Sequence, residues 1–111
     1  YIAKGDICGL RLRVRRISSS QTLTEMDTFI LVTASSKITL TLPSSPQSGQ
    51  LYFIKLVGSG QFDVQVGASG HYINKGRSSH VTSWGFNSAV IVTLVWDRVN
   101  KIWQGGYIGA D

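Results

Sequence analysis

The chain has 111 residues, of which 42% are hydrophobic and 15% are charged, and it contains one cysteine. This length supports a single domain core, the composition is too apolar for intrinsic disorder, and one cysteine cannot form an internal disulfide. The formal net charge of +5 favours anionic partners such as nucleic acid, sialylated or sulfated glycans or a membrane surface, although the same charge also suits a small domain that simply stays dispersed.

The beginning of the chain has no leader-like pattern. The first ten residues, YIAKGDICGL, lack a charged start followed by an apolar run, and no stretch approaches the roughly 18 uninterrupted apolar residues of a membrane span. We therefore expect no membrane insertion. Because the chain begins at Tyr1 rather than Met, we interpret residues 1–111 as one domain from the C-terminal part of a longer chain.

Short runs with strand character follow one another along the first half. Residues 10–17 alternate apolar and basic side chains, which predicts a half-buried strand with one basic face. Its apolar positions are Leu10, Leu12 and Val14, and its basic positions are Arg11, Arg13 and Arg15. Further strands are expected at 28–33 and 37–43. Thr22 followed by Glu25 has the spacing of a capping box, which leaves room for at most one helical turn before residue 28.

The middle of the chain contains the strongest turn signals. Both prolines and a glycine fall in residues 43–50, which predicts a surface loop. The apolar runs 51–57 and 61–66 flank the short segment Gly-Ser-Gly at 58–60, and we interpret them as a hairpin. Residues 67–85 are irregular, with only brief strand character near 72–73 and 80–82.

The last third predicts two long strands. The stretch AVIVTLVW (89–96) is the most apolar of the chain, and its β-branched residues predict the central buried strand of a sheet. A turn at 97–100 leads to a last strand at 101–108, which would bring Trp96 and Trp103 into cross-strand contact. About eight or nine short strands without a convincing helix predict an all-β fold, either an antiparallel β-sandwich of jelly-roll type or a small barrel.

The chain lacks the groupings that enzymes and metal sites require. Its six carboxylates are scattered in positions that suit solvated side chains, so no catalytic pair is expected. Cys8, His71 and His80 are too widely spaced for zinc ligands. The segment at 58–60 precedes a strand rather than the helix that a phosphate cradle needs. We expect no enzyme activity, no cofactor and no metal.

Arg11, Arg13, Arg15 and Arg16 form the densest basic cluster. Three of them would lie about 7 Å apart on one strand face, close to the spacing of successive phosphates or sulfates. The cluster could therefore bind a polyanion. The alternative is a structural or interface role, in which arginine pairs with carboxylates or covers apolar surface.

A second candidate site consists of Tyr72, Arg77, His80 and Trp84 in the irregular stretch. Aromatic rings stack on the apolar face of a pyranose, while Arg and His donate hydrogen bonds to hydroxyl or carboxylate groups. These residues therefore predict a receptor site that suits a glycan. The alternative is that Tyr72 and Trp84 close the end of a barrel.

The order of several short motifs resembles a module of bacteriophage tail fibres, tailspikes and related viral fibre heads. The resemblance covers most of the chain from Arg13 onward, and it rests on LTLP (40–43), the GQ-Y-IK segment (49–55), Gly-Ser-Gly (58–60) and the closing LVWD…W (94–103). It implies a β-structured homo-oligomeric fibre domain, usually a trimer, near a receptor-binding tip or linking that tip to a shaft. The chain departs from this pattern in its basic residues 11–16 and in its aromatic residues 71–86.

We therefore expect a virion protein, namely a fibre head domain that forms a homotrimer or a pentamer and attaches to a host-cell surface receptor, with a glycan as one candidate. One alternative is a structural connector that trimerises without binding a receptor. The other is a nucleic-acid-binding module that uses Arg11–Arg16, although nucleic acid is the less favoured partner.

Overall fold

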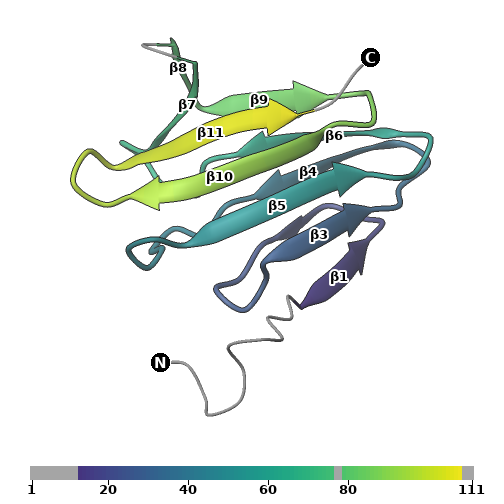
Figure 1. Ribbon diagram of the computed structural model, residues 1–111, viewed down its shortest axis with the longest axis horizontal. Coiled ribbons are helices and arrows are strands. Elements are labelled where there is room, and N and C mark those ends of the chain that lie inside the picture. Colours follow the sequence, from purple (N-terminus) through teal and green to yellow (C-terminus); the bar gives the residue numbers. More distant parts are fainter. Residues whose placement is uncertain (1–12, 77–78, 109–111) are drawn as a thin grey trace.

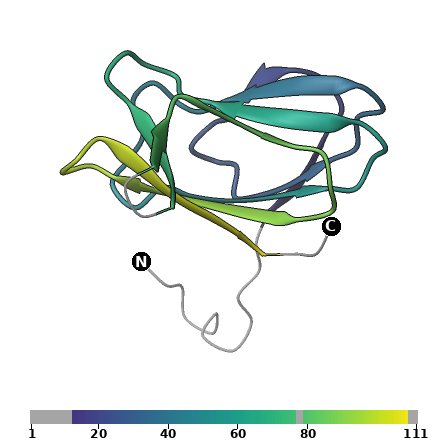
Figure 2. The same cartoon turned by 90° about the horizontal axis from the view of Figure 1, so that it is seen from above.

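The computed structural model describes residues 13–76 and 79–108, which fold into two packed β-sheets without a helix (Figure 1). Within these ranges, a seven-stranded sheet has the order β1-β3-β5-β10-β11-β7-β8 and a four-stranded sheet has the order β2-β4-β6-β9; they form the two layers of Figure 2. The strands are β1 (Val14–Ile17), β2 (Gln21–Thr22), β3 (Phe29–Val32), β4 (Lys37–Thr41), β5 (Leu51–Leu56), β6 (Gln61–Gln65), β7 (Tyr72–Gly76), β8 (Ser79–Val81), β9 (Ser83–Phe86), β10 (Ile91–Asp97) and β11 (Ile102–Ile108). The predicted all-β fold is confirmed.

The first six strands form a coil that passes alternately through the two sheets. β1, β3 and β5 lie parallel and side by side in the seven-stranded sheet, and β2, β4 and β6 do so in the four-stranded sheet. Each strand continues into the opposite layer instead of turning back beside itself. These parallel pairs come from successive turns of the coil, and β7 and β11 in the second half of the chain are also parallel, so the sheets are mixed rather than purely antiparallel.

The second half of the chain supplies the antiparallel pairs. β10 lies between β5 and β11 and is antiparallel to both, as expected for the central strand predicted from its apolar sequence. The turn before β11 is also confirmed, and Trp96 lies opposite Trp103 with ring centroids 5.2 Å apart. β9 closes the four-stranded sheet antiparallel to β6.

The predicted hairpin around Gly-Ser-Gly is wrong. β5 pairs with β3 and β10, whereas β6 pairs with β4 and β9, so the two strands lie in different sheets. The segment is a corner of the coil stacked on the preceding corner, with Gly58 N donating to Val32 O and Gly60 N to Ala34 O, each at 3.0 Å. A Cβ on Gly58 would overlap the carbonyl oxygen of Ala34. The glycines therefore permit close backbone contact between corners rather than a hairpin turn.

No helical turn follows Thr22, because a different residue organises this segment. The carboxylate of Asp27 accepts hydrogen bonds from Thr24 N at 2.9 Å and from the Thr24 hydroxyl at 3.3 Å. Asp27 N in turn donates to Thr24 O at 3.1 Å, which closes a tight turn. β3 begins at Phe29, two residues later, so the chain has no room for a helix.

The core lies between the two sheets and consists of every second side chain of most strands. The largest fully buried side chains come from both layers, and they include Trp103, Tyr52 and Phe62. The rings of Tyr52 and Trp103 pack in a tilted arrangement with centroids 5.6 Å apart, and the Tyr52 hydroxyl donates to Thr24 O at 2.8 Å. This bond ties the turn before β3 to the middle of the seven-stranded sheet.

Candidate functional site

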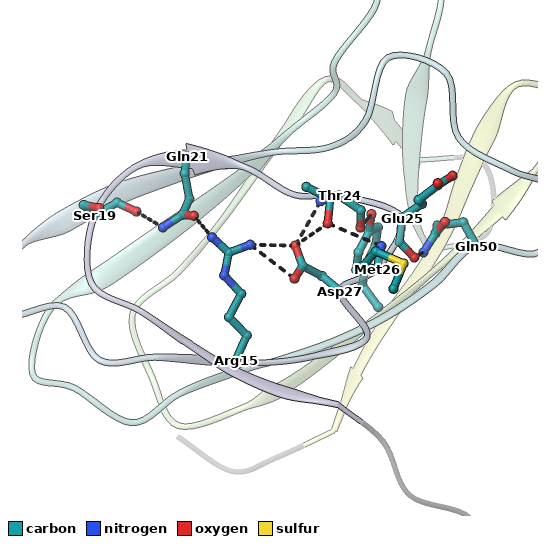
Figure 3. Close-up of polar contacts among 9 residues, drawn as sticks. Arg15, Ser19, Gln21, Thr24, Glu25, Met26, Asp27 and Gln50 are labelled. Carbon is teal, nitrogen blue, oxygen red and sulfur yellow. Dashed lines mark hydrogen bonds and ion pairs between the residues drawn. The ribbon is translucent and has the colours of Figure 1, made fainter.

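Arg15 points into the molecule, contrary to the predicted basic face of its strand. Arg15 and Ile17 occupy the inward positions of β1, while Val14 is 57% exposed. Arg15 Nη1 donates to both carboxylate oxygens of Asp27, at 3.2 and 2.9 Å, and its Nη2 donates to Gln21 Oε1 (Figure 3). Asp27 is only 5% exposed, and a carboxylate buried to this degree needs a charged partner. This need places the arginine, not the valine, on the inner face.

The basic cluster therefore does not form one regular row of charge. Arg13 and Arg16 are exposed, but Arg16 projects from the face of β1 opposite to Arg15. Arg11 lies outside the described residues. Arg15 is already paired with the carboxylate of Asp27. Its contacts therefore favour the structural role, in which arginine pairs with a carboxylate, over polyanion binding.

The residues of the predicted glycan site lie in two places. Tyr72 on β7 and His80 on β8 are both exposed, with ring centroids 6.4 Å apart. Trp84 belongs to the other sheet, on β9, and packs against Phe86 and Tyr107 instead. Arg77 lies outside the described residues.

Trp84 forms part of a separate feature, which we call the aromatic hollow. It is an open depression of about 170 Å³ between the edge of the four-stranded sheet and the end of β11. It is lined by Trp84, Gly85, Phe86, Asn87, Ser88, Val90 and Tyr107. The sequence interpretation included only the first of these residues.

The three aromatic rings of the hollow hold one another at fixed angles. The centroid of Trp84 lies 4.7 Å from that of Phe86 and 5.9 Å from that of Tyr107, and Tyr107 stands nearly perpendicular to both rings. A Cβ on Gly105 would come within 3.0 Å of Trp84 Cζ3, so this glycine lets the indole lie close to β11. The two consecutive glycines before Tyr107 are the feature of the sequence that indicates this contact, because glycine inside a strand often marks a place where another group approaches the backbone closely.

The outward side chains of the seven-stranded sheet form a second surface, which we call the outer face. Its apolar members are Val14, Phe29, Leu31, Leu51, Phe53, Ile91, Val95, Ile102 and Ile108, all partly or well exposed. Val14, Phe29 and Phe53 are neighbours in register across β1, β3 and β5, and the two phenyl rings stack at 6.0 Å. The outer face is thus apolar across β1, β3 and β5 in this row, whereas Arg16 and Lys55 lie on either side of Leu31 in the next row.

The four-stranded sheet presents a contrasting surface. The outward positions of β4 and β6 are polar and include Thr39, Thr41, Gln65 and the ion pair Lys37–Asp63, whose N–O distance is 3.3 Å. The sequence contains the same contrast, because KITLT and QFDVQ alternate whereas FILV and LYFIKL are almost continuously apolar. Continuous apolar runs are typical of strands covered on both faces.

Hydrogen bonds, first that from the Asn100 side chain, lower the pKa of Asp97, and two further titratable side chains have pKa values shifted mainly by burial. Burial, and to a smaller extent the charge of Lys101, lowers the pKa of His71, whose ring lies 4.6 Å from that of Trp96. Burial, followed by the negative charges of Asp27 and Glu25, raises the pKa of Tyr52. Neither His71 nor Tyr52 lines the aromatic hollow or the outer face.

The residues that the structure describes contain no group of three or more His, Cys, Asp or Glu side chains arranged to hold a metal ion. In the same part of the chain, no helix is long and apolar enough to cross a membrane. Neither a scan against models of known protein families nor a search of curated protein sequences finds a match to this chain.

Proposed function

We propose that this chain is the head domain of a viral or bacteriophage fibre, that it assembles with identical copies through the outer face, and that it attaches the virion to a receptor on the host-cell surface. The expected assembly is a homotrimer. The single observation that supports assembly is the apolar outer face, which lies opposite a polar face on the same small domain.

Leaving the outer face in water is costly for an isolated domain. Full burial of one Phe, Leu or Ile side chain contributes about 1.5–3 kcal/mol, and the outer face holds several such side chains that are only partly covered. Monomeric proteins seldom expose apolar patches of more than a few hundred Å², and larger ones mark interaction sites. Further copies of the same face are a suitable cover, because identical apolar faces can turn toward a common axis and bury one another.

The charges around the outer face also suit self-association. Arg16 and Lys55 project near one end of the outer face, in register with Leu31, whereas Asp97 projects at the far end of β10. The two ends of the face therefore differ in sign, and a head-to-tail contact between the positive end of one copy and the negative end of the next would pair unlike charges and can close into a ring of three. Nucleic-acid binding has less support, because Arg15 is occupied by Asp27.

Light scattering coupled to gel filtration tests the assembly. We expect the wild type at micromolar concentration to have about three times the monomer mass of 12.1 kDa. Phe53→Lys, which places a charge in the centre of the outer face, should be monomeric, and Gln65→Lys on the polar sheet is the matched control that should keep the wild-type mass.

Circular dichroism and the thermal midpoint would show that both variants remain folded. A wild type that is monomeric at about 100 µM, well above the dissociation constants of stable assemblies, would refute the assembly. A pentamer would retain it and change only the symmetry. A pure connector would self-associate in the same way but bind no receptor, so attachment needs a test of its own.

A further inference from the structure

The aromatic hollow lies on an open side of the sandwich where strands of both sheets end. β9 is the edge strand of the four-stranded sheet. β7 pairs with β11 only over Ile102–Gln104, so among the described residues Gly105–Ile108 have no strand partner on that side. Backbone N–H and C=O groups at such edges can accept a ligand.

The walls of the hollow are held in place before any ligand arrives. Phe86 stacks on the buried Phe62 at 5.3 Å, which anchors one wall in the core. Trp84 lies against Gly105 of the facing strand, and Tyr107 is 56% exposed. A rigid aromatic platform with an accessible ring binds a flat apolar surface without first paying for side-chain ordering.

The chemistry of the lining identifies the class of ligand. Its polar side chains are the amide of Asn87 and the hydroxyls of Ser88 and Tyr107, and none of the residues that line it is charged. Aromatic rings beside uncharged hydrogen-bonding groups match a molecule with one apolar face and a rim of hydroxyl groups. At about 170 Å³ the hollow is smaller than typical ligand pockets of roughly 300–1,000 Å³, so it has room for a single ring.

We propose that the aromatic hollow binds one neutral pyranose ring, stacked on Trp84 and Tyr107 and hydrogen-bonded by Asn87 and Ser88. The ring would belong to a glycan of the host-cell surface, and this last step rests on the proposed function, whereas binding of the free sugar does not. A single ring in an open hollow binds with a Kd of about 1–10 mM. Several copies in one assembly raise such a weak affinity to a useful one.

The test is an NMR titration of the ¹⁵N-labelled chain, with the indole N–H signal of Trp84 assigned by its loss in Trp84→Phe. The probes are methyl β-galactopyranoside, methyl β-glucopyranoside and N-acetylglucosamine, with N-acetylneuraminic acid as the charged comparison. Tyr107→Ala removes an exposed wall of the hollow, and Tyr72→Ala removes an aromatic ring that is 43% exposed at the other candidate position. Phe53→Lys supplies the form expected to be monomeric.

We expect a saturable shift of the Trp84 signal with at least one neutral probe, weakened about tenfold or more in Tyr107→Ala and unchanged in Tyr72→Ala and Phe53→Lys. No saturable shift up to about 50 mM sugar would overturn the proposal. The proposal would also be overturned if Tyr107→Ala bound the neutral sugar as tightly as the wild type does, or if only Tyr72→Ala lost sugar binding. Tighter binding of N-acetylneuraminic acid than of the neutral sugars would overturn it as well. If the wild type is monomeric and still binds the sugar, the monomeric mass refutes the assembly while the titration supports the sugar site. The two proposals can therefore fail separately.

Discussion

At the scale of single residues, Asp27 decides which face of β1 turns inward. Alternation of apolar and basic residues correctly predicts a strand there, but it favours an inward Val14. The structure instead turns Arg15 inward, because its guanidinium neutralises a carboxylate that reaches it from twelve positions later in the chain. Periodicity along one strand cannot reveal a partner that arrives from the next turn of the coil, so the inward orientation of Arg15 could not be predicted from the sequence of β1.

His71 makes stability depend on pH. Its pKa lies below the ordinary value of 6.5 in the folded chain, because burial of the ring disfavours its charged form and, to a smaller extent, the charge of Lys101 does the same. The unfolded chain therefore binds a proton more readily than the folded one as the pH falls below 6.5. The stabilisation from neutral His71 is complete above this pH and is lost as the pH falls through the lower folded value.

We expect the urea midpoint of the wild type to fall between about pH 7.5 and pH 5, a range in which most carboxylates stay ionised. His71→Gln should show a smaller fall, since its side chain does not titrate. His80→Gln, which changes an exposed ring outside the core, serves as the control and should keep the wild-type response. Identical pH profiles for the wild type and His71→Gln would contradict this account.

At the scale of elements, strands were easier to predict than their partners. The runs at β3, β4, β5 and β10 are recognisable from composition and periodicity, and the hairpin between β10 and β11 follows from its turn, in which Asp97 accepts hydrogen bonds from Val99 N and Asn100 N. The corner at 58–60 shows why the pairing of β5 and β6 could not be predicted from the sequence. Glycines suit a hairpin turn and a close stack of two corners equally well, and only the position of the preceding corner distinguishes them.

Stacked corners predict which glycines are essential. A Cβ on Gly67 would overlap the carbonyl oxygen of Leu42 on the preceding turn, and backbone cannot move aside as a flexible side chain can. Gly67→Ala should therefore lower the free energy of unfolding by about 1–3 kcal/mol. Gly76→Ala is the matched control, because nothing lies within 4 Å of its Cβ position, and its effect should stay within about 0.5 kcal/mol. Urea unfolding measures both, and similar values for the two variants would argue against close stacking of the corners.

At the scale of the whole molecule, the two candidate surfaces differ in how far the sequence could predict them. The apolar runs of β3, β5 and β10 carried the signal for a sheet covered on both sides, although the structure was needed to show which face stays uncovered. The glycines at 105–106 indicate a close approach in the sequence but not its partner, since Trp84 and Tyr107 come from different sheets and meet only when the sandwich closes. Tyr72 and Trp84 looked equivalent in the sequence but project from separate parts of the fold.

An assembly built on the outer face makes thermal stability depend on protein concentration. If folded chains associate and unfolded chains do not, mass action favours the folded state as concentration rises. For a trimer, each tenfold rise adds on the order of 1 kcal/mol per chain, which raises the midpoint of a domain this size by several degrees. We expect this rise for the wild type and for Gln65→Lys in calorimetry at micromolar to near-millimolar concentration. Phe53→Lys should melt at one temperature throughout, because its outer face can no longer close against a second copy. Equal, concentration-independent midpoints for all three proteins would mean that this apolar sheet face stays in water.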